Sequence, residues 1–273
     1  MTQTQVAVGT FARAGSAVRA GLRLGQAVPR KPAGVTGGQW NAASGAHLDF
    51  LVDDGAAPFA VQIGPPAGSG SPAARVDRLT NAVCDAAGIG VLRVGSTTLR
   101  PDAHGRRIVE YVVDARAWAG STIGGGPDLP YRDILGRLPD GRTGYVNDLG
   151  AVARAAAVEA FAERQLADPI IRTLRVRWTA GPAEGWAWLE VAPGAHVFER
   201  VRVEERRMSA GIDPARLAED LATAAIGERW KMRHSEPLTT VDRAHLAAAL
   251  DGLRARRDEL DGGFAFDHLT FRV

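Results

Sequence analysis

The sequence predicts an α/β core of mixed strands and helices, followed by an α+β domain that contains an antiparallel meander. In the first part, short apolar strands at 47–52 and 59–63 precede an amphipathic helix over 73–87 and a third strand over 89–94. A helix between two strands favours a parallel pair joined by a right-handed crossover. In the second part, three strand-like segments follow one another with short Gly-Pro and Pro-Gly connections, which is the pattern of a meander.

Two further helices are expected around the first three strands. Residues 10–24 are predicted as a helix because Phe11, Ala14, Val18 and Leu22 fall near helical spacing. Residues 106–118 form the other expected helix. The predicted order in this part is therefore helix, strand, strand, helix, strand, helix.

A Gly-rich segment over 120–130 is the predicted linker between two domains, 1–119 and 131–273. Beyond it we expect an Ala-rich helix and the three meander strands, then a helix that Asp213 caps and Pro214 begins, and finally another helix and a closing strand. The ranges predicted for these elements are 148–167, 170–179, 186–191, 197–204, 213–230, 239–260 and 264–273.

Composition excludes several classes of protein. The chain has 273 residues and a formal net charge of +2, so its overall charge does not indicate a polyanion-binding protein. Cys84 is the sole cysteine, which excludes an intramolecular disulfide and a cysteine-based zinc site. No segment is long and apolar enough to suggest a membrane span or a signal peptide, so we expect a cytoplasmic protein without membrane contact. Lys31 and Lys231 are the only lysines.

The first part contains a recognisable series of short motifs: His47-Leu48-Asp49-Phe50-Leu51-Val52, Phe59-Ala60-Val61-Gln62-Ile63, Ala86-Ala87-Gly88 and Val91-Leu92-Arg93-Val94. Over residues 10–118 this series resembles a nuclease-like domain of many bacterial proteins, which is a branch of the PD-(D/E)XK superfamily. The resemblance implies a mixed sheet flanked by helices. It also implies Mg²⁺-assisted phosphodiester hydrolysis, with two carboxylates on the metal, an assisting lysine and a helix glutamate.

Most of the implied catalytic positions are altered. Asp49 stands at the first carboxylate, but Gln62 replaces the second acidic residue and Gly64 replaces the lysine. No Asp or Glu occurs in the first 48 residues, so the helix glutamate is missing as well. Asp77 and Asn81 lie one helical turn apart and could supply a migrated ligand, and the alternative is that Asp77 is a solvated helix residue paired with Arg75 or Arg78.

His47 lies on the same side of its strand as Asp49. It is expected as a hydrogen-bond partner of that carboxylate, with transition-metal binding as the alternative. Only an active enzyme would need Mg²⁺, on Asp49, and no other cofactor is expected.

Two groups of basic residues are candidates for binding. The first 48 residues carry five basic side chains and no acidic one, which suits either phosphate contact or a solvated face; they are Arg13, Arg19, Arg23, Arg30 and Lys31. In the meander, strand alternation gathers arginines and tryptophans on one predicted face: Arg175, Arg177, Trp186, Trp188, Arg200 and Arg202. Such a face suits nucleic-acid bases or a protein partner. The alternative is that a helix covers the tryptophans and that Glu190, Glu199 or Glu204 pairs with the arginines.

Three hypotheses follow for the whole chain. The first is a nuclease-fold protein that has lost catalysis and binds nucleic acid or a protein partner. The second is an active metal-dependent endonuclease with a site rearranged around Asp49, Gln62 and Asp77. The third is a structural or regulatory interaction module that works through the second part of the chain.

Overall fold

The computed structural model describes residues 5–6, 16–120, 135–137, 143–145 and 149–266, and it is a mixed α/β structure. It divides into two compact units, which are described separately. The first consists of Met1–Tyr131 and Glu204–Ile212, and the second of Arg132–Val203 and Asp213–Val273. The predicted linker lies, except for Gly120, outside the described residues. The first unit also contains the later segment Glu204–Ile212. The predicted boundaries of 1–119 and 131–273 had placed this segment in the second domain.

The first unit is built on five strands in the order β1-β2-β3-β4-β5. Neighbouring strands are antiparallel from β1 to β4, whereas β4 and β5 are parallel. Their bounds are Gln5–Val6, Ala17–Arg23, His47–Asp53, Phe59–Gly64 and Gly90–Gly95. The predicted strands at 47–52, 59–63 and 89–94 and the predicted parallel pair are confirmed.

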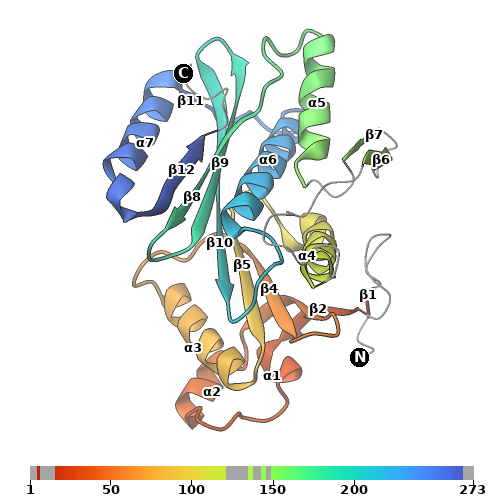
Figure 1. Cartoon of the computed structure of the whole chain (residues 1–273), viewed down its shortest axis with the longest axis vertical. Helices are drawn as coiled ribbons and strands as arrows, with labels where there is room; N and C mark the ends of the chain where they lie inside the picture. The colour runs from red at the N-terminus through yellow and green to blue at the C-terminus, as the bar shows by residue number, and fades with distance from the viewer. Residues whose placement is uncertain (1–4, 7–15, 121–134, 138–142, 146–148, 267–273) are drawn as a thin grey trace. The chain divides into compact units, whose positions relative to one another are not determined.

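Two long helices lie on either side of these strands (Figure 1), and both were predicted. Helix α3, Pro72–Ala86, starts at Ser71, whose hydroxyl accepts a hydrogen bond from the Ala74 N–H at 3.1 Å. Helix α4, Arg106–Ala119, follows a short π-helix, η1, at Pro101–Gly105. Two short helices, α1 at Leu24–Ala27 and α2 at Gly37–Ala43, were not predicted.

The prediction of a helix over 10–24 is wrong where the structure can test it. Residues Ala17–Arg23 form β2 and pair with β3, and residues 10–15 lie outside the described residues. Gly21 has φ +65°, a left-handed conformation that an α-helix does not contain. The apolar spacing of Val18 and Leu22 fits a strand as well as a helix, because a separation of four residues is two strand repeats and is also close to one helical turn of 3.6 residues.

The second unit contains an antiparallel sheet in the order β10-β9-β8-β12, with β11 beside β10. The predicted meander is confirmed, and its strands are β8, β9 and β10. The bounds of the five strands are Arg172–Trp178 for β8, Ala183–Ala192 for β9, Ala195–Arg206 for β10, Val241–Asp242 for β11 and Leu260–Phe266 for β12. The end of β10, from Glu204 on, belongs to the first unit. A separate pair of short strands, β6 at Leu135–Arg137 and β7 at Thr143–Tyr145, is antiparallel.

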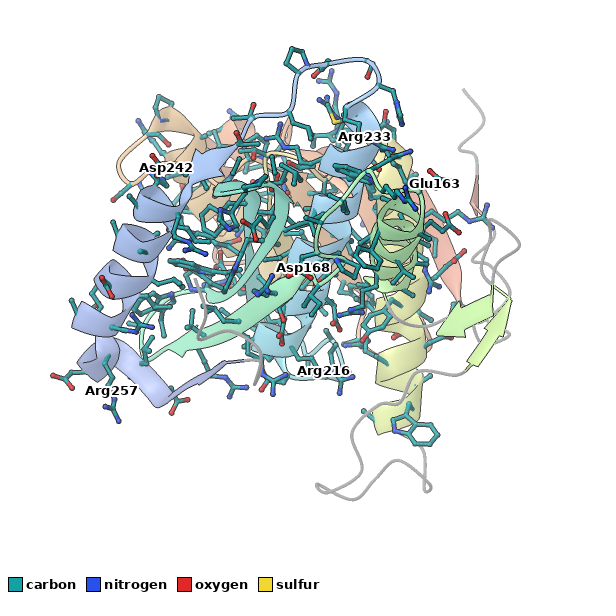
Figure 2. The ribbon with its side chains drawn as sticks, turned by 90° about the horizontal axis from the view of Figure 1, so that it is seen from above. Glu163, Asp168, Arg216, Arg233, Asp242 and Arg257 are labelled. Carbon is teal, nitrogen blue, oxygen red and sulfur yellow. The ribbon has the colours of Figure 1, made fainter. Side chains whose placement is uncertain are left out.

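Helices cover both faces of this second sheet. Helix α6, Pro214–Met232, packs on one face so closely that a Cβ on Gly185 would lie 2.1 Å from the Ala218 carbonyl. Helix α7, Arg243–Ala255, covers the other face with Leu246, Leu250 and Leu253. Figure 2 shows α7 beside the sheet between the labelled Asp242 and Arg257, with α6 on the other side.

The ends of several predicted elements differ from those in the structure. Helix α5 is shorter than predicted, at Ala151–Ala162, and packs against α6. Helix α6 starts after Asp213 as expected, and the Asp213 side chain accepts a hydrogen bond from the Ala215 N–H. Helix α7 begins only after Asp242, which caps it, and the 3₁₀ turn η2 at Arg257–Glu259 follows it. The predicted strand over 264–273 begins earlier, at Leu260, and residues 267–273 lie outside the described residues.

Among the described residues, no helix combines the length and the apolar character that crossing a bilayer would require.

Candidate functional site

Three polar side chains form a row across the middle strands of the first unit. The register places Gln62 of β4 beside Arg93 of β5, and the antiparallel pairing of β3 with β4 places Asp49 beside Gln62. We call Asp49, Gln62 and Arg93 the Asp49 row. Helix α3 lies over this face: Arg93 Nη2 donates to the Asp77 carbonyl at 3.4 Å, and Arg93 Nε lies 3.9 Å from Asp77 Oδ1. The structure thus brings Asp49 and Gln62 together and places Asp77 against the third member of the row.

Asp49 is held by its own sheet. Its Oδ2 accepts a hydrogen bond from the Ile63 N–H at 2.6 Å, and its Oδ1 lies 3.4 Å from His47 Nε2. Burial raises the pKa of Asp49 above its ordinary value, although the Ile63 N–H and the nearby His47 oppose this shift. The geometry agrees with the expectation that His47 is a partner of this carboxylate.

Several buried polar atoms near the row lack hydrogen-bond partners among the described residues. Gln62 Nε2 donates to the His47 carbonyl at 2.9 Å, but Gln62 Oε1 has no partner. Thr80 Oγ1 and Asn81 Oδ1, on the buried side of α3, are also without partners, as is Arg93 Nε. Buried polar atoms in proteins are nearly always hydrogen-bonded, and Gln62 Oε1 remains able to accept a hydrogen bond from a polar group brought to the row.

The row does not fit the Mg²⁺ site that the resemblance implies. Mg²⁺ needs hard anionic oxygens, and the row supplies one carboxylate, which already accepts a backbone hydrogen bond. Asp77 faces the guanidinium of Arg93, instead of Arg75 or Arg78, so its charge is matched by a fixed cation. Arg93 also lies 3.7 Å from Glu204 Oε2. Within the part of the chain that the structure describes, no three His, Cys, Asp or Glu side chains converge as metal ligands.

Four arginines lie on the two elements next to the row, the strand β2 and the helix α3. Arg19 and Arg23 of β2 pair with Leu51 and His47, so they lie on the same face as Asp49. Between them Gly21 leaves space, because a Cβ there would meet no atom within 4 Å. Arg75 and Arg78 are exposed on α3.

We call Arg19, Arg23, Arg75 and Arg78 the basic face. None of the four forms an ion pair with any described carboxylate. Of the other basic residues expected to contact phosphate, Lys31 donates to the Val35 carbonyl at 2.7 Å, Arg30 is exposed, and Arg13 lies outside the described residues.

The prediction that six meander residues share one face is wrong. Trp186 pairs with both Leu174 and Arg200, so these three side chains point the same way, whereas Arg175 pairs with Gly185 on the opposite face. Arg175 and Arg177 therefore lie on the α6 side, and Trp186, Trp188, Arg200 and Arg202 on the α7 side. Trp186 is 5% exposed and Trp188 1%, so neither ring is available to stack with a nucleobase.

The four arginines of that predicted face are all paired with carboxylates. On the α6 side, Arg175 pairs with Glu219 at 3.2 Å and Arg177 with Asp213 at 2.8 Å. On the α7 side, Arg200 and Arg202 share Glu184. The alternative given with the prediction is therefore right in kind, because a helix covers the tryptophans and carboxylates pair with the arginines. The partners differ from the expected Glu190, Glu199 and Glu204.

Two features of the site were missed although the sequence carried a signal for each. Arg93 is the only charged residue in an otherwise apolar strand, which indicates a specific role for that side chain. In β9, the run Trp186-Ala187-Trp188-Leu189 is apolar at every position, which indicates a strand covered on both faces.

Comparison with known proteins adds no family to this description. No protein-family model, no curated protein and no solved structure matches the chain. The resemblance to PD-(D/E)XK nucleases therefore stays a prediction from the residues.

Proposed function

We propose that the first unit is a nuclease-like module that binds nucleic acid without cleaving it. The observation that carries the proposal is the basic face: four arginines without a carboxylate partner in the described residues, around a row that retains a single carboxylate of the implied metal site. Unpaired guanidinium groups are available to neutralise phosphates, and phosphate contacts supply most of the affinity of sequence-independent binding.

The Asp49 row supports binding more than catalysis. In the family that the chain resembles, a metal bound by two carboxylates activates water and stabilises charge on the phosphate. Here Gln62 brings no negative charge, and Arg93 matches the charge of Asp77. Arg19 and Arg23 lie on β2, the strand next to that of the retained aspartate, and guanidinium groups suit contact with a phosphate or a base edge because they form paired hydrogen bonds with such acceptors.

Binding can be tested with labelled duplex and single-stranded oligonucleotides by fluorescence anisotropy. The test variant is Arg19→Gln/Arg23→Gln. The matched control is Arg216→Gln/Arg257→Gln, which removes the same charge from two arginines of the second unit, both labelled in Figure 2. Neither forms an ion pair with the described residues. We expect weaker binding of all sequences by the test variant and parental binding by the control. Parental binding by both variants would contradict the proposal.

Catalysis is tested separately. The proposal predicts no heat of Mg²⁺ or Mn²⁺ binding by calorimetry and no cleavage of either substrate by the parent protein. Cleavage that Asp49→Ala abolishes would favour the active-nuclease hypothesis, with the rearranged site on Asp49, Gln62 and Asp77. Absence of any oligonucleotide binding would favour the structural or regulatory module.

A further inference from the structure

A second arrangement of arginines, on the α7 side of the second unit, is organised around one buried carboxylate. The Glu184 side chain is 3% exposed and accepts four hydrogen bonds. Arg200 donates from Nε at 2.7 Å and from Nη2 at 2.6 Å, Arg202 donates from Nε at 3.0 Å, and Trp186 donates from Nε1 at 3.2 Å. Both oxygens of the carboxylate are therefore used entirely in holding these side chains.

The two arginines remain accessible although their partner is not. Their side chains are 36% and 39% exposed for Arg200 and Arg202, respectively. Arg202 gives Glu184 only its Nε, so its two terminal nitrogens have no partner among the described residues, and neither does Nη1 of Arg200. Burying a carboxylate costs free energy of desolvation unless the carboxylate is paired. Here the buried Glu184 is paired, and it holds two guanidinium groups that remain partly exposed.

Arg256 adds a third guanidinium to the same face. It lies over the ring of Trp178 at 4.1 Å and donates to Glu259 from Nε and Nη2. The hydrogen bond to Glu259 is the main cause that raises the pKa of Arg256, and the negative charge of Glu184 also raises it. Three guanidinium groups against two carboxylates leave one net positive charge. We call Arg200, Arg202 and Arg256 the arginine triad.

From this geometry we propose that the arginine triad binds an extended acidic protein segment that carries carboxylates at alternate positions. Arg200 and Arg202 lie two residues apart on β10, so their Cα atoms are about 6.7 Å apart at the ordinary rise of a strand. Two acidic side chains at positions i and i+2 of an extended segment have the same spacing. Arg202 can then donate to one carboxylate from both terminal nitrogens, the paired geometry that Arg–carboxylate contacts favour, and Arg200 can donate to the other from Nη1.

A nucleic acid fits this surface less well. The triad carries one net positive charge, whereas binding to a polyanion depends on the number of phosphates neutralised. The neighbouring tryptophan rings are buried and offer no face to a base. The inference does not rest on the function proposed for the first unit, because all residues concerned belong to the second.

The experiment uses the full chain and a blocked peptide, Gly-Glu-Thr-Glu-Gly, with Gly-Gln-Thr-Gln-Gly as the uncharged control. Binding is followed by NMR at the indole N–H of Trp186, which is hydrogen-bonded to Glu184 and should respond when the triad is occupied. We expect the acidic peptide, and not its uncharged control, to shift this resonance at low ionic strength.

Arg202→Gln is the main variant, because Arg200 keeps both of its hydrogen bonds to Glu184 and the buried carboxylate stays paired. Arg256→Gln is the second, since Arg256 forms no hydrogen bond to Glu184. We expect about tenfold weaker peptide binding for Arg202→Gln, which is typical of losing a charge-assisted hydrogen bond, and a smaller loss for Arg256→Gln, which removes only the net positive charge of the face. Arg216→Gln should bind the peptide as the parent does.

Three results would overturn the inference: no shift with the acidic peptide, equal affinity in the parent and both variants, or a shift produced by oligo-dT but not by the peptide. The last would assign the triad to nucleic acid. Failure of the peptide-binding proposal is distinguishable from failure of the nucleic-acid proposal, because the two use different residues and different ligands. Arg19→Gln/Arg23→Gln should leave peptide binding unchanged.

Discussion

At the scale of single residues, the pKa values of Asp49 and Asp213 are shifted in opposite directions. Burial raises the pKa of Asp49, and one backbone N–H and a histidine only partly oppose it. Burial also acts to raise the pKa of Asp213, but hydrogen bonds from Arg177 and from the Ala215 N–H outweigh it and lower the pKa overall. The first charge costs folding stability and the second contributes to it.

This contrast gives a pair of predictions at neutral pH. The folded-state pKa of Asp49 is raised, so ionisation lowers the free energy of unfolding as pH rises through that pKa. Asp49→Asn removes this loss and keeps an acceptor for the Ile63 N–H, so its melting temperature should equal or exceed that of the parent. Asp213→Asn should melt lower at neutral pH, and the difference should vanish in acid, below the lowered pKa. A lower melting temperature for Asp49→Asn at neutral pH would indicate that the charge supports the fold.

His196 should make the second unit sensitive to acid. Burial lowers its pKa, and Arg243 and Arg172 act in the same direction, while Glu190 and the Val241 backbone oppose them. The unfolded chain therefore binds a proton first, so stability is complete above the ordinary histidine pKa of 6.5 and falls as pH drops below it. Urea midpoints at neutral and mildly acidic pH should differ more for the parent than for His196→Gln. An equal pH dependence in both proteins would show that another group is responsible.

Strand alternation predicts which residues of one strand share a face. It does not predict which faces of neighbouring strands coincide. It placed Asp49 and His47 on one face, as the structure does. It failed in the meander because the arginines on both faces had been assigned to one. The register between β8 and β9, which sets Leu174 against Trp186, depends on how the strands align across the turn, and the sequence of each strand does not specify that alignment.

At the scale of elements, close helix–sheet contact limits what the second unit tolerates. Gly185 of β9 lies against the backbone of α6, and an added Cβ would approach Ala218 to 2.1 Å. Gly185→Ala should lower the free energy of unfolding by about 3 kcal/mol or more, at the upper end of overpacking effects. Gly252 of α7 is the matched control, because a Cβ there meets nothing within 4 Å. Gly252→Ala should raise stability by up to about 1 kcal/mol. Both are measured by urea denaturation, and equal effects would contradict the packing described.

The elements that the sequence predicted well carry strong local signals. Helix α3 has a serine cap and a proline at its start, and the strand predicted over 89–94 contains the β-branched residues Ile89, Val91 and Val94. Strand β2 was mistaken for a helix because its hydrogen-bond partner, β3, lies more than twenty residues later in the chain. The start of α7 was misplaced because Asp242, which caps it, was taken as part of the helix.

At the scale of the whole molecule, the formal net charge of +2 does not tell which arginines are paired with carboxylates and which are not. In the second unit, the arginines of the meander pair with Glu184, Glu219 and Asp213. In the first unit, the basic face has no such partners among the described residues. Composition could not separate these cases, because ion pairs form between residues that only the fold brings together.

The salt dependence of duplex binding by the full chain tests the central claim most directly. If Arg19 and Arg23 each contact a phosphate, the logarithm of the association constant should fall linearly with the logarithm of salt concentration. The slope of Arg19→Gln/Arg23→Gln should then be shallower than that of the parent by about 2. The account predicts this change together with an intact duplex after incubation with Mg²⁺. Equal slopes for parent and variant, or cleavage of the duplex, would contradict it.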